Sequence, residues 1–318
     1  MQRRSFSAVT RNCRGLLVAL LVFAGAGARF ALAVPTLVEE RNSTYNNIYI
    51  YKDGPHMIMT FGHNKRFYTE TIYDTTNELA LPVTYTRFMT VGLAYSSALD
   101  NLLEIGFGGG RTAWYLHKHV PSLDITAVEL DPAVVQLAKK HFGVRSEDKF
   151  KITVSDGRSH MLKSSDTWDV IMIDAYRGPF VPFHLLTEEF FKVVKSKLKP
   201  GGVVVQNIEP TTMMFDSAIA TIQRVLPNVD VYDAGGNVVA VAYDGPRQSQ
   251  AQLAARAAAL QTQHRFAYPL TELVTARRVV NRTVPGKVLS DDFAPVESLL
   301  AIEKHNRKLE EFSEPAAK

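Results

Sequence analysis

The segment LLEIGFGGGRTAWYL at 102–116 constrains the fold of this 318-residue chain most strongly. An apolar strand leads into an acidic residue, a glycine-rich loop and then a helix. Glycine in such a turn permits positive φ angles and close approach of the backbone to a nucleotide. The third glycine of the dinucleotide pattern G-x-G-x-x-G would fall at position 111, which is Arg111. The segment therefore predicts a nucleotide site that is not of the dinucleotide type, with a packing turn in another α/β protein as the alternative. Its candidate cofactor-binding residues are Glu104, Gly106, Gly108 and Gly109.

Three further acids follow apolar runs. Glu129 ends the run in DITAVEL, Asp156 follows KITVS, and Asp174 ends WDVIMID. Because open α/β sheets bind ligands at the carboxyl ends of their strands, we expect these acids and Glu104 to meet at one edge. Four acids there suit a cationic ligand better than a pyrophosphate. The cationic nucleoside that fits is a sulfonium, either S-adenosylmethionine or its decarboxylated form.

Two of these acids have predicted roles within the nucleoside site. Glu129 lies 23 residues beyond Gly106, where an acid can accept hydrogen bonds from both ribose hydroxyls. Asp156 could accept the adenine amino group, and Gly157 would let the ring approach. The alternatives are a solvated strand end for Glu129 and an ordinary Asp-Gly turn at 156–157.

The order of elements predicts an α/β fold with a doubly wound, mostly parallel sheet. A small β-hairpin region at 45–69 has turns around Asp53-Gly54 and Asn64-Lys65, and a helix is expected over 79–97. Strands are expected near 101–105, 125–130, 150–154, 169–174 and 202–208. The run 229–243 predicts an antiparallel terminal hairpin, and 248–264 predicts an outer helix. The expected divisions are a leader at 1–33, the β-hairpin region at 34–78, the main domain at 79–305 and a polar tail at 306–318.

The basic excess of the chain is concentrated at its start. The net charge is +4, but five arginines and no acid precede residue 34, and the remainder has 31 basic against 32 acidic residues. A nearly neutral body gives no reason to expect nucleic-acid binding.

The same start predicts a secretory signal peptide. The apolar run GLLVALLVFAGAGA at 15–28 precedes Ala31-Leu32-Ala33, a small-residue cleavage pattern. The expected location is exported, periplasmic or secreted. Arg3-Arg4 resembles a twin-arginine start, and the choice between that route and the general one stays open. An uncleaved membrane anchor and an organelle presequence are the alternatives, and a membrane contact is expected only with the anchor.

No metal site is expected. The one cysteine, Cys13, precedes the apolar run and would be lost on cleavage, and the nine histidines show no metal-ligand spacing. The expected partner is a small-molecule amine, and we leave a homodimer open.

The order of glycine loop, acid, Asp-Gly and strand-end Asp resembles class I methyltransferases, and more specifically the spermidine synthase (polyamine aminopropyltransferase) family. The most specific segment is DAYRGPFVPFHLLTEEFF at 174–191, which is similar to the family's strand-end aspartate, substrate loop and following helix. LSDDFAPVESLL at 289–300 resembles the C-terminal segment of bacterial members. Tyr45-Asn46-Asn47-Ile48 resembles the family's Tyr-Gln-x-Ile, with Asn46 in place of the Gln.

The resemblance implies that Asp174 is catalytic. The matching aspartate accepts a proton from the attacking amine, which is protonated at neutral pH and has no free lone pair until it loses that proton. A helix cap is the alternative role for Asp174. The resemblance also implies that Asn46 and Tyr232 contact the substrate.

Two departures concern the acceptor. Polyamine-making members have a second aspartate three residues after the first, whereas this chain has Arg177, and their Tyr-His-Glu segment is not visible where LPVTYTRFM occupies 81–89. The leading hypothesis is a spermidine synthase-like transferase of polyamine biosynthesis that moves an aminopropyl group from decarboxylated S-adenosylmethionine to an amine. The alternatives are a methyl or aminocarboxypropyl transferase, in which Arg177 pairs with the carboxylate of S-adenosylmethionine, and a non-catalytic nucleoside-binding module.

Overall fold

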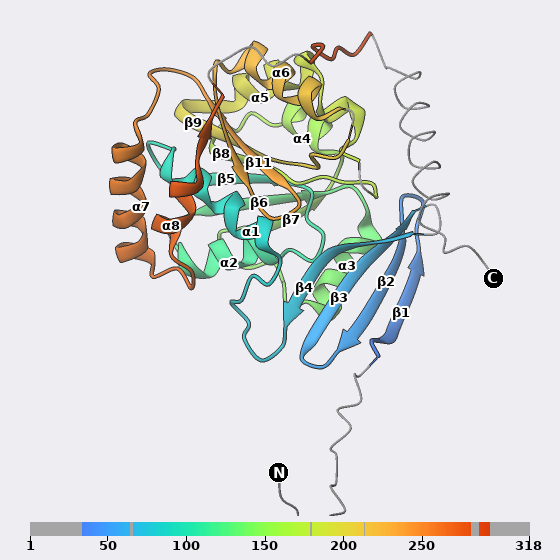
Figure 1. The fold of residues 1–318 in the computed structure, drawn as a ribbon. Coiled ribbons are helices and arrows are strands. Elements are labelled where there is room, and N and C mark those ends of the chain that lie inside the picture. The colour runs from blue at the N-terminus through green and yellow to red at the C-terminus, as the bar shows by residue number, and fades with distance from the viewer. Residues whose placement is uncertain (1–33, 64–65, 179, 213, 281–285, 293–318) are drawn as a thin grey trace, which may run out of the picture. The chain divides into compact units, whose positions relative to one another are not determined.

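The chain from Val34 onward contains two β-sheets and the helices that cover them (Figure 1). This computed structural model describes residues 34–63, 66–178, 180–212, 214–280 and 286–292. The predicted leader and polar tail, the Asn64-Lys65 turn and most of 289–300 lie outside these residues. Among the described residues, no helix has the length and apolar character needed to span a bilayer.

The first sheet is antiparallel, with strand order β1-β2-β3-β4. Its strands are β1 (Thr36–Asn42), β2 (Asn47–Asp53), β3 (His56–His63) and β4 (Arg66–Asp74). The hairpin around Asp53-Gly54 is as predicted, with Asp53 opposite His56. The prediction missed β1, because this edge strand is exposed along most of its length and lacks apolar alternation.

The second sheet has the order β12-β10-β11-β9-β8-β5-β6-β7. Strands β9, β8, β5, β6 and β7 are parallel to one another. Strands β11, β10 and β12 pair in antiparallel fashion at the β9 side of the sheet. The bounds are β5 (Asn101–Ile105), β6 (Asp124–Glu129), β7 (Phe150–Val154), β8 (Trp168–Ile173), β9 (Leu198–Ile208), β10 (Asn228–Asp233), β11 (Val238–Tyr243) and β12 (Arg278–Val279). The predicted doubly wound, mostly parallel sheet with an antiparallel hairpin is therefore confirmed.

Helices cover both faces of this sheet. They are α1 (Thr84–Met89), α2 (Arg111–His119), α3 (Pro132–His141), α4 (Gly157–Lys163), α5 (Glu188–Lys197), α6 (Phe215–Val225), α7 (Gln250–His264) and α8 (Leu270–Leu273). Short 3-10 turns, η1, η2 and η3, span Thr90–Ala94, Phe183–Leu185 and Val274–Ala276. The helix expected over 79–97 is shorter than predicted, because Pro82 disfavours helix before it and the chain tightens into η1 from Thr90.

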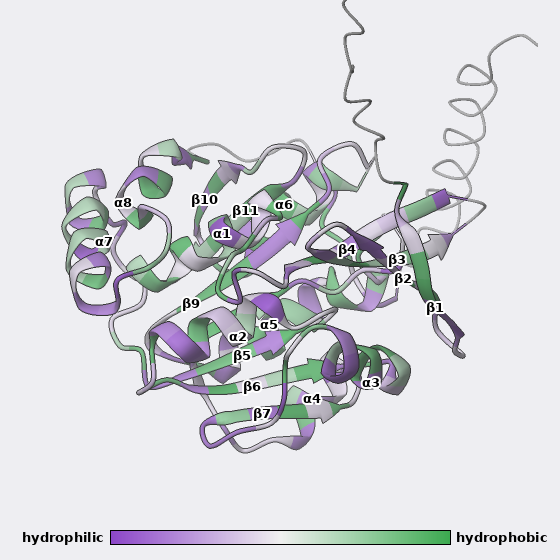
Figure 2. Cartoon of the chain, turned by 90° about the horizontal axis from the view of Figure 1, so that it is seen from below, coloured by the Kyte–Doolittle hydropathy of each residue, from purple (hydrophilic) through white to green (hydrophobic). Residues whose placement is uncertain are grey.

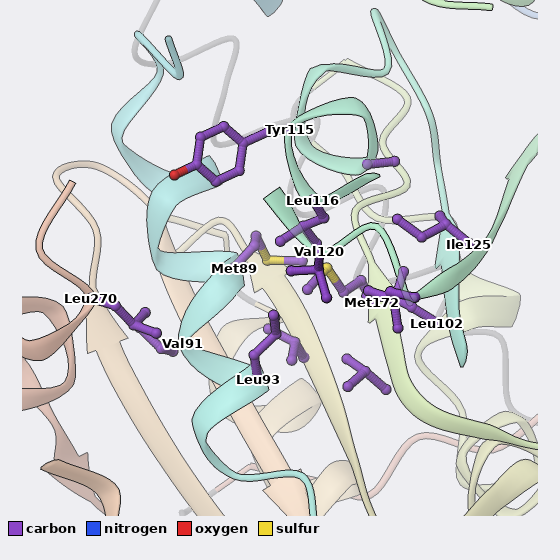
Figure 3. Packing of buried hydrophobic residues seen from close by; sticks show 14 of the residues in the cluster. Met89, Val91, Leu93, Leu102, Tyr115, Leu116, Val120, Ile125, Met172 and Leu270 are labelled. Atoms are coloured by element: carbon purple, nitrogen blue, oxygen red, sulfur yellow. The ribbon is translucent and has the colours of Figure 1, made fainter. Parts of the chain in front are cut away.

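The core explains why the strand ends are held rigidly. Met89 of α1 lies near Met172 of the sheet, and Val91 of η1 lies beside Leu270 (Figure 3). Hydrophobic residues, in green, run along β6 (Figure 2). A separate cluster packs the first sheet on α3 and includes Ile48, Ile50, Met59, Val134, Leu137 and Phe142. The first sheet is thereby fixed beside the carboxyl ends of the parallel strands.

Candidate functional site

A cavity of about 610 Å³ lies at the carboxyl ends of the parallel strands, and the first sheet forms part of its wall. This size is typical of small-molecule sites. Most predicted site residues line it: Asn46, Glu104, Gly106, Gly108, Glu129, Asp156, Gly157, Asp174 and Arg177. Gly109 and Tyr232 do not.

Asp174 directly follows β8, and its backbone N–H donates to the Ile105 carbonyl over 2.8 Å. Asn207 Nδ2 donates to Asp174 Oδ1 over 2.8 Å, and the Tyr85 hydroxyl also hydrogen-bonds the carboxylate. Burial raises the pKa of Asp174 to about 6 despite these two donors. It does not cap a helix, so the alternative role is wrong. A carboxylate with this pKa is ionised at neutral pH and can still take up a proton.

Glu129 ends β6 beneath the glycine loop. Its Oε2 accepts from the Phe107 backbone N–H at 3.0 Å, and its Oε1 accepts from the Asp131 N–H at 2.9 Å. Burial raises the pKa of Glu129, and these backbone donors oppose the rise. The carboxylate therefore fixes the loop as well as facing the cavity.

Asp156 is the N-cap of α4, where Oδ1 accepts from the Ser159 N–H at 2.8 Å. Its Oδ2 lies 2.8 Å from His184 Nε2, and this contact is the main reason that the pKa of Asp156 is lowered. His184 follows the loop that starts at Ala175, so the pair ties that loop to the predicted adenine pocket.

The glycines are explained first by packing within the protein. A Cβ on Gly106, whose φ is +88°, would lie 2.2 Å from the Asp174 carbonyl oxygen. A Cβ on Gly157 would lie 2.2 Å from Ile105 Cγ2. The N–H of Gly109 donates to Thr71 Oγ1 over 2.8 Å. These contacts join the loop to the end of β8, α4 to β5, and the loop to β4. Close backbone approach to a ligand stays a prediction.

The three predicted substrate-binding residues lie in different surroundings. Asn46 Nδ2 donates to Asp131 Oδ2 over 3.1 Å and lines the cavity. Arg177 is exposed on the loop after β8 and lines the cavity too. Tyr232 is buried in the core, and its hydroxyl bonds the Tyr95 hydroxyl at 2.6 Å, so the structure places it away from the cavity wall.

Sequence reasoning missed Glu70 and Tyr85. Glu70 is on β4 and Tyr85 is on α1, and both line the cavity with Asp174. Tyr85 lies within LPVTYTRFM at 81–89, the segment that occupies the place of the family's Tyr-His-Glu, so this tyrosine was the available signal.

A family model described as "Spermine/spermidine synthase domain" matches residues 84–234. A polyamine aminopropyltransferase of Vibrio vulnificus is 26% identical over 282 residues, which are 85% of this chain and 93% of that protein. Over these residues the chain is similar to the spermidine synthase family. Curated relatives in this family are transferases, and the chain is classed with them.

Solved structures of similar proteins agree with this fold. A probable spermidine synthase from Corynebacterium glutamicum has a TM-score of 0.63 at 19% identity and covers 83% of this chain and 98% of that chain. Human methyltransferase-like protein 13, solved in complex with SAH, has a TM-score of 0.53 at 27% identity and covers 57% of this chain and 92% of that chain. The spermidine synthase family thus shares its fold with methyltransferases, as the sequence predicted.

Proposed function

We propose that this protein transfers the aminopropyl group of decarboxylated S-adenosylmethionine to an amine. The observation that supports this most directly is Asp174, a carboxylate with a pKa of about 6 in the same cavity as the glycine loop and Glu129. Similarity to polyamine aminopropyltransferases supports aminopropyl transfer in general.

In this proposal the cavity residues position two substrates and move one proton. Glu129 and the 106–109 loop bind the nucleoside, and Asp174 receives a proton from the ammonium form of the acceptor. The freed nitrogen lone pair attacks the methylene carbon of the aminopropyl arm that is bonded to sulfur. The new C–N bond forms as the C–S bond breaks, and the sulfur leaves as neutral methylthioadenosine. Such a displacement depends mainly on alignment of the reacting atoms, so the chain needs no covalent intermediate.

The test is a transfer assay with decarboxylated S-adenosylmethionine and a panel of amines. Asp174→Asn keeps the shape of the side chain but cannot take a proton, so we expect a rate loss of about 10²–10⁴. Affinity for methylthioadenosine should stay within about twofold. Asp148→Asn is the matched control, because Asp148 is exposed and outside the cavity. If wild-type protein binds no adenosyl sulfonium or thioether, the nucleoside site itself is refuted.

A second candidate is transfer of a methyl or aminocarboxypropyl group from S-adenosylmethionine itself. Two observations favour it: Arg177 in the cavity wall, and the 27% identity to a methyltransferase solved with SAH. A guanidinium there could pair with the carboxylate that decarboxylation removes. Arg177→Asp separates the two candidates. It should raise diamine turnover under the first, and abolish binding of S-adenosylmethionine under the second.

A further inference from the structure

We propose that Glu70 and Glu104 form a subsite beside Asp174 that binds a primary ammonium group of the substrate. This inference rests on the proposed function and assigns the substrate a second cationic group. The source of that group is either the propylamine arm of the donor or the far end of a diamine acceptor.

The first observation is the environment of Glu104. This residue lies on β5 in the interior of the sheet, is only 3% exposed, and lines the cavity. Its Oε2 is buried and has no hydrogen-bond partner within the described part of the chain. A buried acceptor without a partner is costly, and native proteins rarely retain one without a ligand, a water or a functional reason.

The second observation is that Glu70 reaches the same space from the other sheet. It lies on β4 and lines the cavity, and its carboxylate makes no hydrogen bond or ion pair with another described residue. Burial and the charges of Asp174 and Glu129 raise the pKa values of both Glu70 and Glu104. Both carboxylates therefore lie within electrostatic range of the same two acids.

An organic cation suits these acids better than the other ligand types. A ligand carboxylate would be repelled by the three acids, whereas an ammonium would relieve their mutual repulsion and donate up to three hydrogen bonds. Among the described residues, no three side chains converge as a metal site requires. The position of Arg177, where polyamine-making relatives have a second aspartate, leaves Glu70 and Glu104 as the acids that can hold this ammonium.

The experiment uses two adenosyl thioethers, both with an uncharged sulfur, that differ in the arm on that sulfur. S-adenosyl-3-thiopropylamine has a propylamine arm that is protonated at neutral pH, and methylthioadenosine has a methyl group in its place. Calorimetry would compare their affinities for wild-type protein, Glu70→Gln, Glu104→Gln and the control Glu272→Gln, an exposed residue of α8 outside the cavity. In parallel, KM would be measured for butane-1,4-diamine and for n-butylamine.

If the donor arm occupies the subsite, each cavity variant should weaken binding of the propylamine thioether about tenfold to a hundredfold and change methylthioadenosine affinity less than about twofold. If the acceptor occupies it, the same variants should raise KM for the diamine by that factor and leave KM for the monoamine unchanged. The inference is overturned if every constant stays within about twofold of wild type.

Two further results keep this test separate from the proposed function. If wild-type protein shows no transfer but still prefers the propylamine thioether through Glu70 and Glu104, the proposed reaction fails and the subsite stands. If a Gln variant does not fold, the affinities of wild-type protein for the two thioethers test whether the donor arm occupies the subsite. It should then bind the propylamine thioether at least about tenfold more tightly than methylthioadenosine, and equal affinity together with equal KM values for the two amines refutes the subsite.

Discussion

Tyr85→Phe tests whether the Asp174 carboxylate is the group that must be ionised for transfer. The Tyr85 hydroxyl donates to that carboxylate and lowers its pKa, while burial raises the pKa to about 6. Phenylalanine removes the donor and keeps the ring. Because the charged form loses a stabilising hydrogen bond, the pKa of Asp174 should rise further, and the acid limb of the pH–rate profile should move to higher pH.

The size of the shift follows from the strength of one hydrogen bond. A net contribution of about 0.5–1.5 kcal/mol corresponds to roughly 0.4–1 pKa unit. At pH 6, about half of the wild-type Asp174 is ionised, and in the variant this fraction falls to roughly a tenth to a quarter. At pH 8 the carboxylate is ionised in both proteins, so their rates should agree within about twofold.

The assay is kcat/KM for aminopropyl transfer between pH 5 and pH 9, with Tyr51→Phe as the control. Tyr51 lies on β2 and outside the cavity, so its loss should leave the profile unchanged. The reasoning is refuted if Tyr85→Phe leaves the acid limb in place or moves it to lower pH while the protein remains folded. An equal rate loss at every pH would instead mean that Tyr85 acts on alignment and not on the proton.

Three shorter predictions concern the nucleoside site, the loop and the leader. Glu129→Ala should weaken methylthioadenosine binding about tenfold to a hundredfold by calorimetry, and unchanged affinity would remove Glu129 from the ribose site. Gly106→Ala should lower the free energy of unfolding in urea by about 2–4 kcal/mol, because its Cβ would overlap the Asp174 carbonyl at a φ of +88°. Gly54→Ala, with a φ of +55° and open space around it, should cost only about 1–2 kcal/mol, and equal losses would contradict the overlap. Mass spectrometry of exported protein should show cleavage after Ala33, and an intact Met1 in a soluble cytosolic fraction would refute export.

The sequence alone determined the main sheet and the place of the nucleoside site. Periodic apolar runs fixed β5 to β9 within a few residues, because buried parallel strands are nearly continuous in hydrophobicity. The rule that ligands meet the carboxyl ends of such strands then brought Glu104, Glu129, Asp156 and Asp174 together, and all four line one cavity.

Only the tertiary structure decided what else faces that cavity. Glu70 comes from β4, and its approach to Asp174 depends on how the first sheet packs on α3. Tyr85 comes from α1, and its approach depends on how α1 packs beside β9 and β11. No local pattern encodes either packing. Tyr232 matched a substrate-binding residue by its neighbours in sequence, yet the pairing of β10 with β11 directs it into the core, where it bonds Tyr95. Local sequence specifies strands and turns because these depend on neighbouring residues, whereas a side chain's access to a ligand depends on contacts between segments far apart in the chain.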